Sequence, residues 1–218
     1  MSNYNVRKKY NKFINTFDKG IKYLEEKHFK SIASKALIFE TGIINLIWQS
    51  WNSFWRVYWL SEILGGIDIN NKKIIPYAPS LSEEEAVFFL INGAIGGRIK
   101  HSAETSWGDI SRLTGIAKKM YQIDGKLIPT IPVSIKALNI SSAVGLLGNS
   151  LEHLQLVRNC SVHLDEFNAK RVTTILTYYS LPSYKYPTDL FFAQKISDGK
   201  KAIISWQEEL TTLLTLIY

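Results

Sequence analysis

Large apolar side chains recur at three- and four-residue steps between residues 44 and 59, and this spacing limits the possible folds more than any other feature. The set comprises Ile44, Ile47, Trp48, Trp51, Trp55, Tyr58 and Trp59. Steps of this size place side chains on one face of a long helix. We interpret the tryptophans as core or dimer contacts, and the alternative is stacking against nucleic-acid bases.

Stop and cap signals predict where this helix ends and where the next begins. Gly65 and Gly66 are expected to end it, because glycine readily adopts the backbone conformation that follows a helix. Ser82 and Glu85 have the spacing of a capping box, in which each side chain satisfies the other's free backbone amide. A helix over about 83–92 should follow.

Helical spacing and caps also dominate the rest of the chain. A further helix is expected over about 105–121. Two more should follow caps at Ser141 or Ser142 and at Asp165, and the last helix should begin near Asp198. Short hairpins are expected over 67–75 and 121–128. The sequence predicts an all-α fold, an irregular bundle of about six helices with loop or hairpin decorations, in a single domain over residues 1–218.

Composition indicates an ordinary globular protein. The most apolar stretch, from Ala36 to Leu60, carries too many polar groups for a membrane span, namely Glu40, Asn45, Gln49, Asn52 and Arg56. The N-terminal residues lack the apolar run of a secretory leader, and the one cysteine, Cys160, cannot form an internal disulfide. We therefore expect a protein of the cytoplasm with no membrane contact.

The net charge of +7 is concentrated near the start of the chain. Through residue 35 there are nine basic and three acidic residues, a net +6. A basic N-terminal helix or arm of this kind would attract a polyanion such as RNA. The alternative is a lysine-rich solvated face without a partner.

One segment, Arg158-Asn159-Cys160-Ser161-Val162-His163, groups the residues best suited to chemistry. Arg158 continues the apolar face set by Leu147, Leu151 and Leu154, while His163 ends a polar stripe on another face. On a continuous helix the five-residue separation turns the two side chains about 140° apart. Their convergence therefore requires a helix break after Asn159, the long reach of the arginine, or a second subunit.

HEPN ribonucleases have a sequence signature on the late helices of a small bundle. It consists of an arginine, then a polar residue that is often asparagine, and later a histidine. The chain resembles this family through Arg158, Asn159 and His163, over about residues 142–180. The resemblance implies a homodimer in which two motifs face a shared cleft. It also implies a toxin or antiviral-defence setting, in which a separate antitoxin or regulatory chain restrains the activity.

These residue types suit metal-independent cleavage of RNA by its own 2′-hydroxyl. His163 could accept the proton of that hydroxyl, because an imidazole titrates near neutral pH. Arg158 could stabilise the charge on the phosphate oxygens through its forked guanidinium. Asn159 could orient the imidazole or bind a phosphate oxygen. The expected products are a 2′,3′-cyclic phosphate and a 5′-hydroxyl.

Other interpretations of the motif remain open. Arg158 and His163 could only satisfy carbonyls at a helix C-terminus. The domain could be a non-catalytic HEPN-like module that binds a protein or RNA partner. Cys160 could be a nucleophile, although we interpret it as a small buried residue.

We expect neither a metal nor a cofactor. The four histidines, His28, His101, His153 and His163, show no ligand spacing, and one cysteine cannot form a thiolate cluster.

Overall fold

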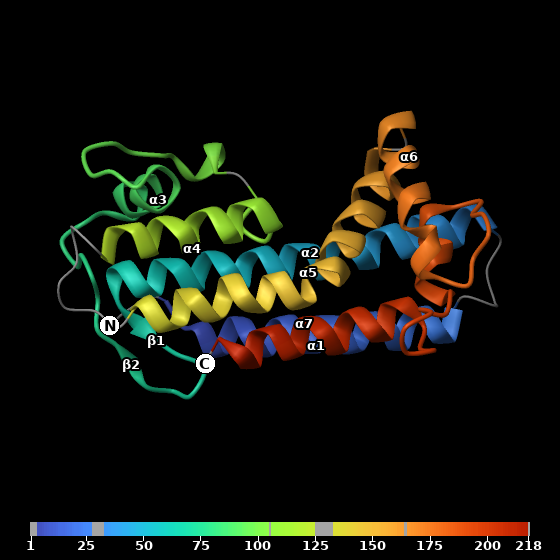
Figure 1. Ribbon diagram of the computed structural model, residues 1–218, viewed down its shortest axis with the longest axis horizontal. Coiled ribbons are helices and arrows are strands. Elements are labelled where there is room, and N and C mark those ends of the chain that lie inside the picture. The colour runs from blue at the N-terminus through green and yellow to red at the C-terminus, as the bar shows by residue number, and fades with distance from the viewer. Residues whose placement is uncertain (1–3, 28–32, 105, 125–132, 164, 218) are drawn as a thin grey trace. The chain divides into compact units, whose positions relative to one another are not determined.

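The computed structural model describes residues 4–27, 33–104, 106–124, 133–163 and 165–217. Helices make up most of this part of the chain (Figure 1), which confirms the predicted all-α class. The α-helices are α1 (Val6–Lys27), α2 (Ala33–Leu64), α3 (Glu83–Asn92), α4 (Ile110–Asp124), α5 (Val133–His163), α6 (Glu166–Ile175) and α7 (Ala202–Leu216). Short 3-10 helices are η1 (His101–Ala103), η2 (Leu176–Tyr178) and η3 (Pro187–Phe192). None of the described helices combines the length and apolarity that a membrane crossing needs.

The chain divides into two compact units. Unit 1 takes its described residues from 1–13, 50–146 and 215–218, and unit 2 takes them from 14–49 and 147–214. Helices α1, α2 and α5 each contribute residues to both units. The bundle arrangement and the single domain over 1–218 stay predictions.

The core of unit 1 is built around the aromatic face of α2. Trp51, Trp55 and Trp59 are at most 1% exposed, and Trp48, in unit 2, is 5% exposed. The interpretation of these tryptophans as core residues is therefore confirmed. Trp51 also donates from Nε1 to the main-chain oxygen of Gly108, at 3.0 Å.

Local signals in unit 1 are located as the sequence predicts. Helix α2 ends at Leu64, before Gly65, whose φ of +87° lies in the left-handed region. Ser82 and Glu85 form the predicted capping box at the start of α3. The helix expected over 105–121 begins later, at Ile110.

One predicted hairpin is present and the other is wrong in part. Strands β1 (Gly66–Ile67) and β2 (Lys73–Ile74) are antiparallel, with Gly66 opposite Ile74, which confirms the hairpin within 67–75. The main-chain oxygen of Tyr4 accepts from the amide of Ile67 at 2.9 Å, so the N-terminal segment lies along β1. Of the hairpin expected over 121–128, residues 121–124 belong to α4 and the remainder lies outside the described residues.

An ion cluster in unit 1 joins residues of α2, of α3 and of the segment around η1. Arg56 on α2 donates to both oxygens of Glu104, at 2.6 and 2.7 Å, and to Glu83 at 2.5 Å. Trp107 and His101 also contact Glu104, whose side chain is only 6% exposed. Burial alone would raise the pKa of Glu104, but these hydrogen bonds lower it to about 2.

Unit 2 contains the last part of α5 with α6 and α7. The predicted cap at Ser141 or Ser142 is wrong, because α5 runs without interruption from Val133 to His163. The predicted cap at Asp165 is confirmed, since its side chain accepts from the amide of Asn168. The last helix begins at Ala202, a few residues after the expected Asp198.

Candidate functional site

Arg158 occupies the last turns of α5 in unit 2 and is half-buried. Its Nε donates to Oδ1 of Asn45 on α2 at 3.1 Å, and its Nη1 donates to Oδ1 of Asn159 at 3.0 Å. Because Leu151 and Leu154 on the same face are fully buried, the arginine continues that face as the sequence predicts. Two amide oxygens therefore fix the position of the guanidinium.

The charge of Arg158 has no negative counterpart among the described residues. No carboxylate in that part of the chain lies within ion-pair distance of the guanidinium. Burial lowers the pKa of Arg158, yet an arginine side chain stays protonated in water. The two amide oxygens accept hydrogen bonds without neutralising the charge, so the guanidinium can still bind an anion.

His163 is the last residue of α5 and is exposed to solvent. The helix is unbroken between Asn159 and His163, so the break that would bring histidine and arginine together is not present. Helical geometry turns the two side chains about 140° apart. Arg158 is directed toward Asn45 on α2, and the fold of one chain does not bring the motif's two ionisable groups together.

Asn159 is hydrogen-bonded to Arg158. Its Oδ1 is the acceptor for Arg158 Nη1, whereas the sequence suggested that it could orient the imidazole or bind phosphate. Asn45, which the sequence marks only as a polar interruption in an apolar stretch, is the second acceptor. Sequence reasoning missed it because a lone asparagine on a buried helix carries no signal for a contact 113 residues away.

The residues between Asn159 and His163 include two buried small side chains. Cys160 is 2% exposed, and burial raises the pKa of its thiol. Ser161 is 6% exposed and donates to the main-chain oxygen of Val157 at 2.7 Å. A buried, protonated thiol is a poor nucleophile, so Cys160 is best described as a packing residue.

Helix α6 starts immediately after the motif (Figure 1), and its cap fixes the chain beyond His163. The pKa of Asp165 is lowered, first by the hydrogen bond from the backbone of Asn168 and also by the nearby charge of His163. Tyr184 interacts with Cys160 and donates to the main-chain oxygen of Ala169 on α6 at 2.9 Å. Residues within the motif and after it are therefore held by specific contacts.

A second histidine in unit 2, His153, is buried in the core. Trp206 donates to the hydroxyl of Tyr179 at 2.8 Å, and that hydroxyl lies 2.6 Å from His153 Nδ1. Since the tryptophan can only donate, the tyrosine hydroxyl keeps its own proton available for Nδ1. Burial and the charge of Lys195 lower the pKa of His153 to about 4, so this imidazole is neutral at pH 7 and does not fit an acid–base role there.

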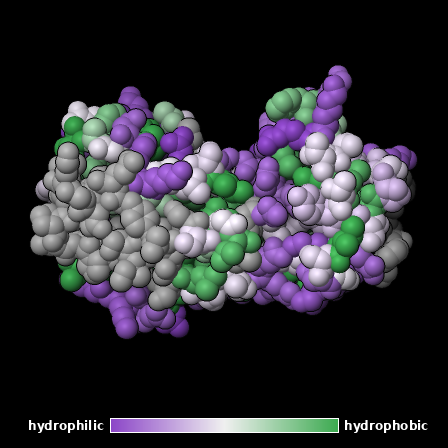
Figure 2. Space-filling view, viewed as in Figure 1, coloured by the Kyte–Doolittle hydropathy of each residue, from purple (hydrophilic) through white to green (hydrophobic). Residues whose placement is uncertain are grey.

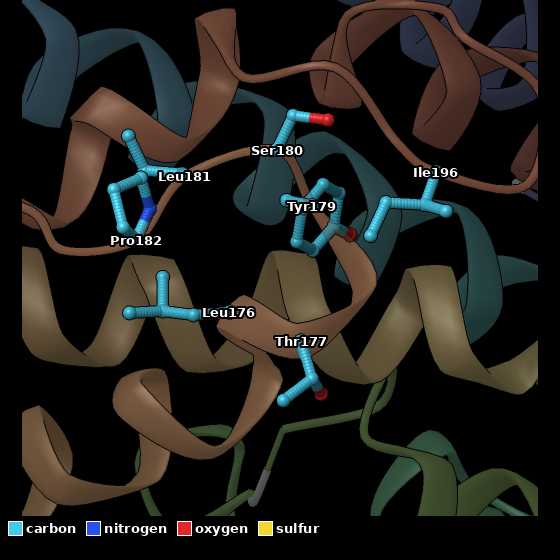
Figure 3. Close-up of a pocket in the computed structure, with 7 residues that line it drawn as sticks. All are labelled: Leu176, Thr177, Tyr179, Ser180, Leu181, Pro182 and Ile196. Carbon is cyan, nitrogen blue, oxygen red and sulfur yellow. The ribbon is translucent and has the colours of Figure 1, made fainter.

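An open cavity of about 540 Å³ lies beside this network in unit 2. Its lining residues are Leu176, Thr177, Tyr179, Ser180, Leu181, Pro182 and Ile196. Figure 3 shows Leu176, Leu181 and Pro182 on one side of the Tyr179 ring and Ile196 on the other. Among the described lining residues only the tyrosine is ionisable, and its hydroxyl is already bound to His153 and Trp206, so they suggest no chemistry.

Basic side chains gather at the start of α1 in unit 1. Arg7, Lys8 and Lys12 are exposed, and Lys9 donates to the hydroxyl of Ser53 at 2.9 Å. Burial lowers the pKa of Lys9, and the like charges of Lys12, Lys8 and Arg56 lower it further. The predicted basic segment is thus helical at residues 6–27 and creates a positive potential at its start.

No group of three or more His, Cys, Asp or Glu side chains that could bind a metal ion occurs within the described ranges. Comparisons with models of known protein families, with curated proteins and with solved structures find no match for this chain.

Proposed function

We propose that this chain is a metal-independent endoribonuclease of the HEPN type, acting in the cytoplasm as a toxin or antiviral-defence effector. The observation that carries the proposal is the half-buried guanidinium of Arg158, held by Asn45 and Asn159 without a carboxylate partner among the described residues. A cation fixed by neutral acceptors is prepared to bind a phosphate. An exposed imidazole, His163, follows five residues later.

In the proposed reaction the 2′-oxygen of RNA attacks the adjacent phosphorus. His163 accepts the proton of the 2′-hydroxyl, and Arg158 donates hydrogen bonds to the phosphate oxygens as their negative charge increases. The bond from phosphorus to the 5′-oxygen breaks, and that oxygen takes up a proton. The products are a 2′,3′-cyclic phosphate and a 5′-hydroxyl, and DNA is not cut because it lacks the attacking group.

The site is proposed to be completed across a homodimer. Because α5 is unbroken, Arg158 and His163 of one chain diverge, so a second copy is the remaining way to bring an arginine and a histidine together. Val162 and Phe167, which flank His163, are 38% and 69% exposed, and apolar side chains of this kind favour burial in an interface. The face drawn in Figure 2 carries hydrophobic side chains interspersed with hydrophilic ones.

The decisive experiment incubates the purified full chain with single-stranded RNA in EDTA. Cleavage with cyclic-phosphate ends, absent on a 2′-deoxy substrate, is expected for the wild type and for His101→Ala, which removes another exposed histidine. His163→Ala should abolish the cutting while leaving the dimer intact. Equal cutting by wild type and His163→Ala, or none by either, would refute the proposal.

A mixing experiment tests the shared site. Alone, Arg158→Gln is expected to cut RNA about 100-fold more slowly than the wild type, and His163→Ala is expected to be inactive. A heterodimer of the two variants contains one site with an intact arginine from one copy and an intact histidine from the other. Mixing should therefore restore cleavage in part, whereas a site built within one chain would stay inactive in the mixture.

A second candidate function is a non-catalytic HEPN-like module that binds RNA or a protein partner, such as a separate antitoxin or regulatory chain. The unbroken end of α5 favours it, because a binding site does not require arginine and histidine to converge. This candidate predicts RNA retention without cutting, equally in wild type and His163→Ala. It also predicts that cell growth on expression does not depend on His163.

A further inference from the structure

A cavity of about 300 Å³ lies in unit 1, and the described residues that line it all belong to helix α4. They are Ser111, Arg112, Gly115, Ile116 and Lys119, whose spacing places them along one face of the helix. Gly115 leaves the space open, because a Cβ built there would meet no atom within 4 Å. Ile116 is buried and gives the cavity an apolar floor. The volume is at the lower end of small-ligand sites.

Two cations line this cavity without ion-pair partners in the described part of the chain. Arg112 is half-buried, and its guanidinium makes no hydrogen bond or ion pair with any described residue. The Nζ of Lys119 donates to the main-chain oxygen of Ile91, near the end of α3, and this neutral acceptor leaves its charge uncompensated.

Asp109, the acidic residue just before α4, is not among the described residues that line the cavity. Its Oδ1 accepts from the amide and the hydroxyl of Ser111, at 2.9 and 2.5 Å, and from the amide of Arg112 at 3.4 Å. These hydrogen bonds direct the carboxylate to the first turn of α4. The described lining of the cavity therefore presents positive charge over an apolar floor.

We propose that this cavity binds the phosphoryl group of a nucleotide. A guanidinium matches phosphate oxygens with two parallel hydrogen bonds, a nearby ammonium adds a point charge, and the apolar floor accommodates an uncharged part of the ligand. The nucleotide can be free or part of an RNA strand. The site does not depend on Arg158, His163 or any cleavage activity.

Calorimetric titration of the full chain with AMP, adenosine and a short single-stranded RNA tests the site. AMP should bind and adenosine should not, because it lacks the phosphoryl group. Arg112→Gln should weaken binding about tenfold or more, since a charge-assisted hydrogen bond is lost. Lys118→Gln is the matched control, because it removes one charge from an exposed position of α4 outside the cavity.

Gly115→Leu should also abolish binding, because the new side chain fills the cavity while the charges are kept. Titrations repeated on His163→Ala should be unchanged, which separates this site from the proposed ribonuclease. If only RNA binds and Arg112→Gln weakens it, the phosphoryl group comes from the RNA backbone. Absence of binding by both AMP and RNA, equal binding of adenosine, or equal losses in Arg112→Gln and Lys118→Gln would overturn the proposal.

Discussion

Two partly buried arginines of this chain have opposite surroundings. Arg56, in unit 1, contacts both oxygens of Glu104 and one of Glu83, and the side chains of Arg56 and Glu104 are 17% and 6% exposed. Arg158, in unit 2, is held by amide oxygens of Asn45 and Asn159. The first guanidinium is neutralised within its own unit, whereas the second has no carboxylate partner in the part of the chain that the structure describes.

The difference teaches how to separate a structural arginine from a functional one. A cation saturated by carboxylates serves the fold, and its loss should leave a buried negative charge unpaired. A cation fixed by neutral acceptors retains its attraction for an external anion, at the cost of partial desolvation. Stability and activity should therefore respond differently to the loss of each arginine.

The largest expected effect is on the stability of unit 1. Arg56→Met should lower the free energy of unfolding by about 3 kcal/mol, because Glu104 is then buried without its partner. Denaturant unfolding would measure this loss. Arg98→Met removes an exposed pair with Glu85 and should cost far less, because solvent screens this pair. Similar losses in the two variants would show that the cluster around Arg56 does not stabilise the fold.

The second effect is on activity. Arg158→Gln should reduce RNA cleavage about 100-fold, since a donor to the transition state is removed. Its free energy of unfolding should fall by only about 1 kcal/mol, because relief of the desolvation of the charge offsets part of the loss of two hydrogen bonds. Arg171→Gln, at an exposed position of α6, should alter neither property. A large stability loss in Arg158→Gln without an effect on cleavage would assign Arg158 to the fold.

The third prediction concerns the pH dependence of stability, which should differ between the two units. Above pH 6.5, His153 is neutral in both the folded and the unfolded chain and contributes no pH dependence. As pH falls from 6.5 to about 4, the unfolded chain takes up a proton that the folded chain does not. Stability should therefore fall by about 2 kcal/mol across this range. Urea unfolding of His153→Gln should lack this part of the pH dependence.

Glu104 affects the stability of the fold in a more acidic pH range. Its folded pKa of about 2 lies below the ordinary 4.5, so its carboxylate stabilises the fold above pH 4.5. That contribution is lost as pH falls from 4.5 toward 2. In Glu104→Gln this acid-induced loss should be reduced, while the loss between pH 6.5 and 4 should remain. A single transition unaffected by either substitution would contradict the assignment.

The smallest effects concern the helix caps of the two units. Ser82→Ala should lower the free energy of unfolding by about 1 kcal/mol and leave cleavage unchanged. Asp165→Ala, two residues after His163, should reduce cleavage severalfold, because the chain beyond the motif loses its cap. Asp165→Asn, which keeps a capping oxygen, should restore most of the rate. Equal rates in all three variants would show that the position of His163 does not depend on α6.

Features encoded by near neighbours in the chain could be predicted. The capping box of Ser82, the cap at Asp165 and the end of α2 before Gly65 each depend on side chains within a few residues. The expected cap near Ser142 failed because α5 continues through it, with Ala143 and Val144 buried beside it. Burial of neighbouring apolar residues outweighs the local preference of serine for a helix start.

Contacts between distant residues could not be predicted. The sequence identified Arg158 and placed it on an apolar face, but its acceptor Asn45 is 113 residues away. The carboxylates of Glu83 and Glu104 likewise meet Arg56 only through the fold. The relation of Arg158 to His163 was left open because it depends on the continuity of α5, which no short pattern determines.

The contact between Trp51 and Gly108 has a consequence for how this chain can change over time. A Cβ at position 108 would lie 2.2 Å from the indole of Trp51, so even alanine does not fit there. The indole in turn donates its hydrogen bond to the main-chain oxygen of Gly108. The two positions are therefore coupled, and related sequences that keep tryptophan at 51 should keep glycine at 108. A larger residue at 108 should occur only together with a smaller side chain at 51.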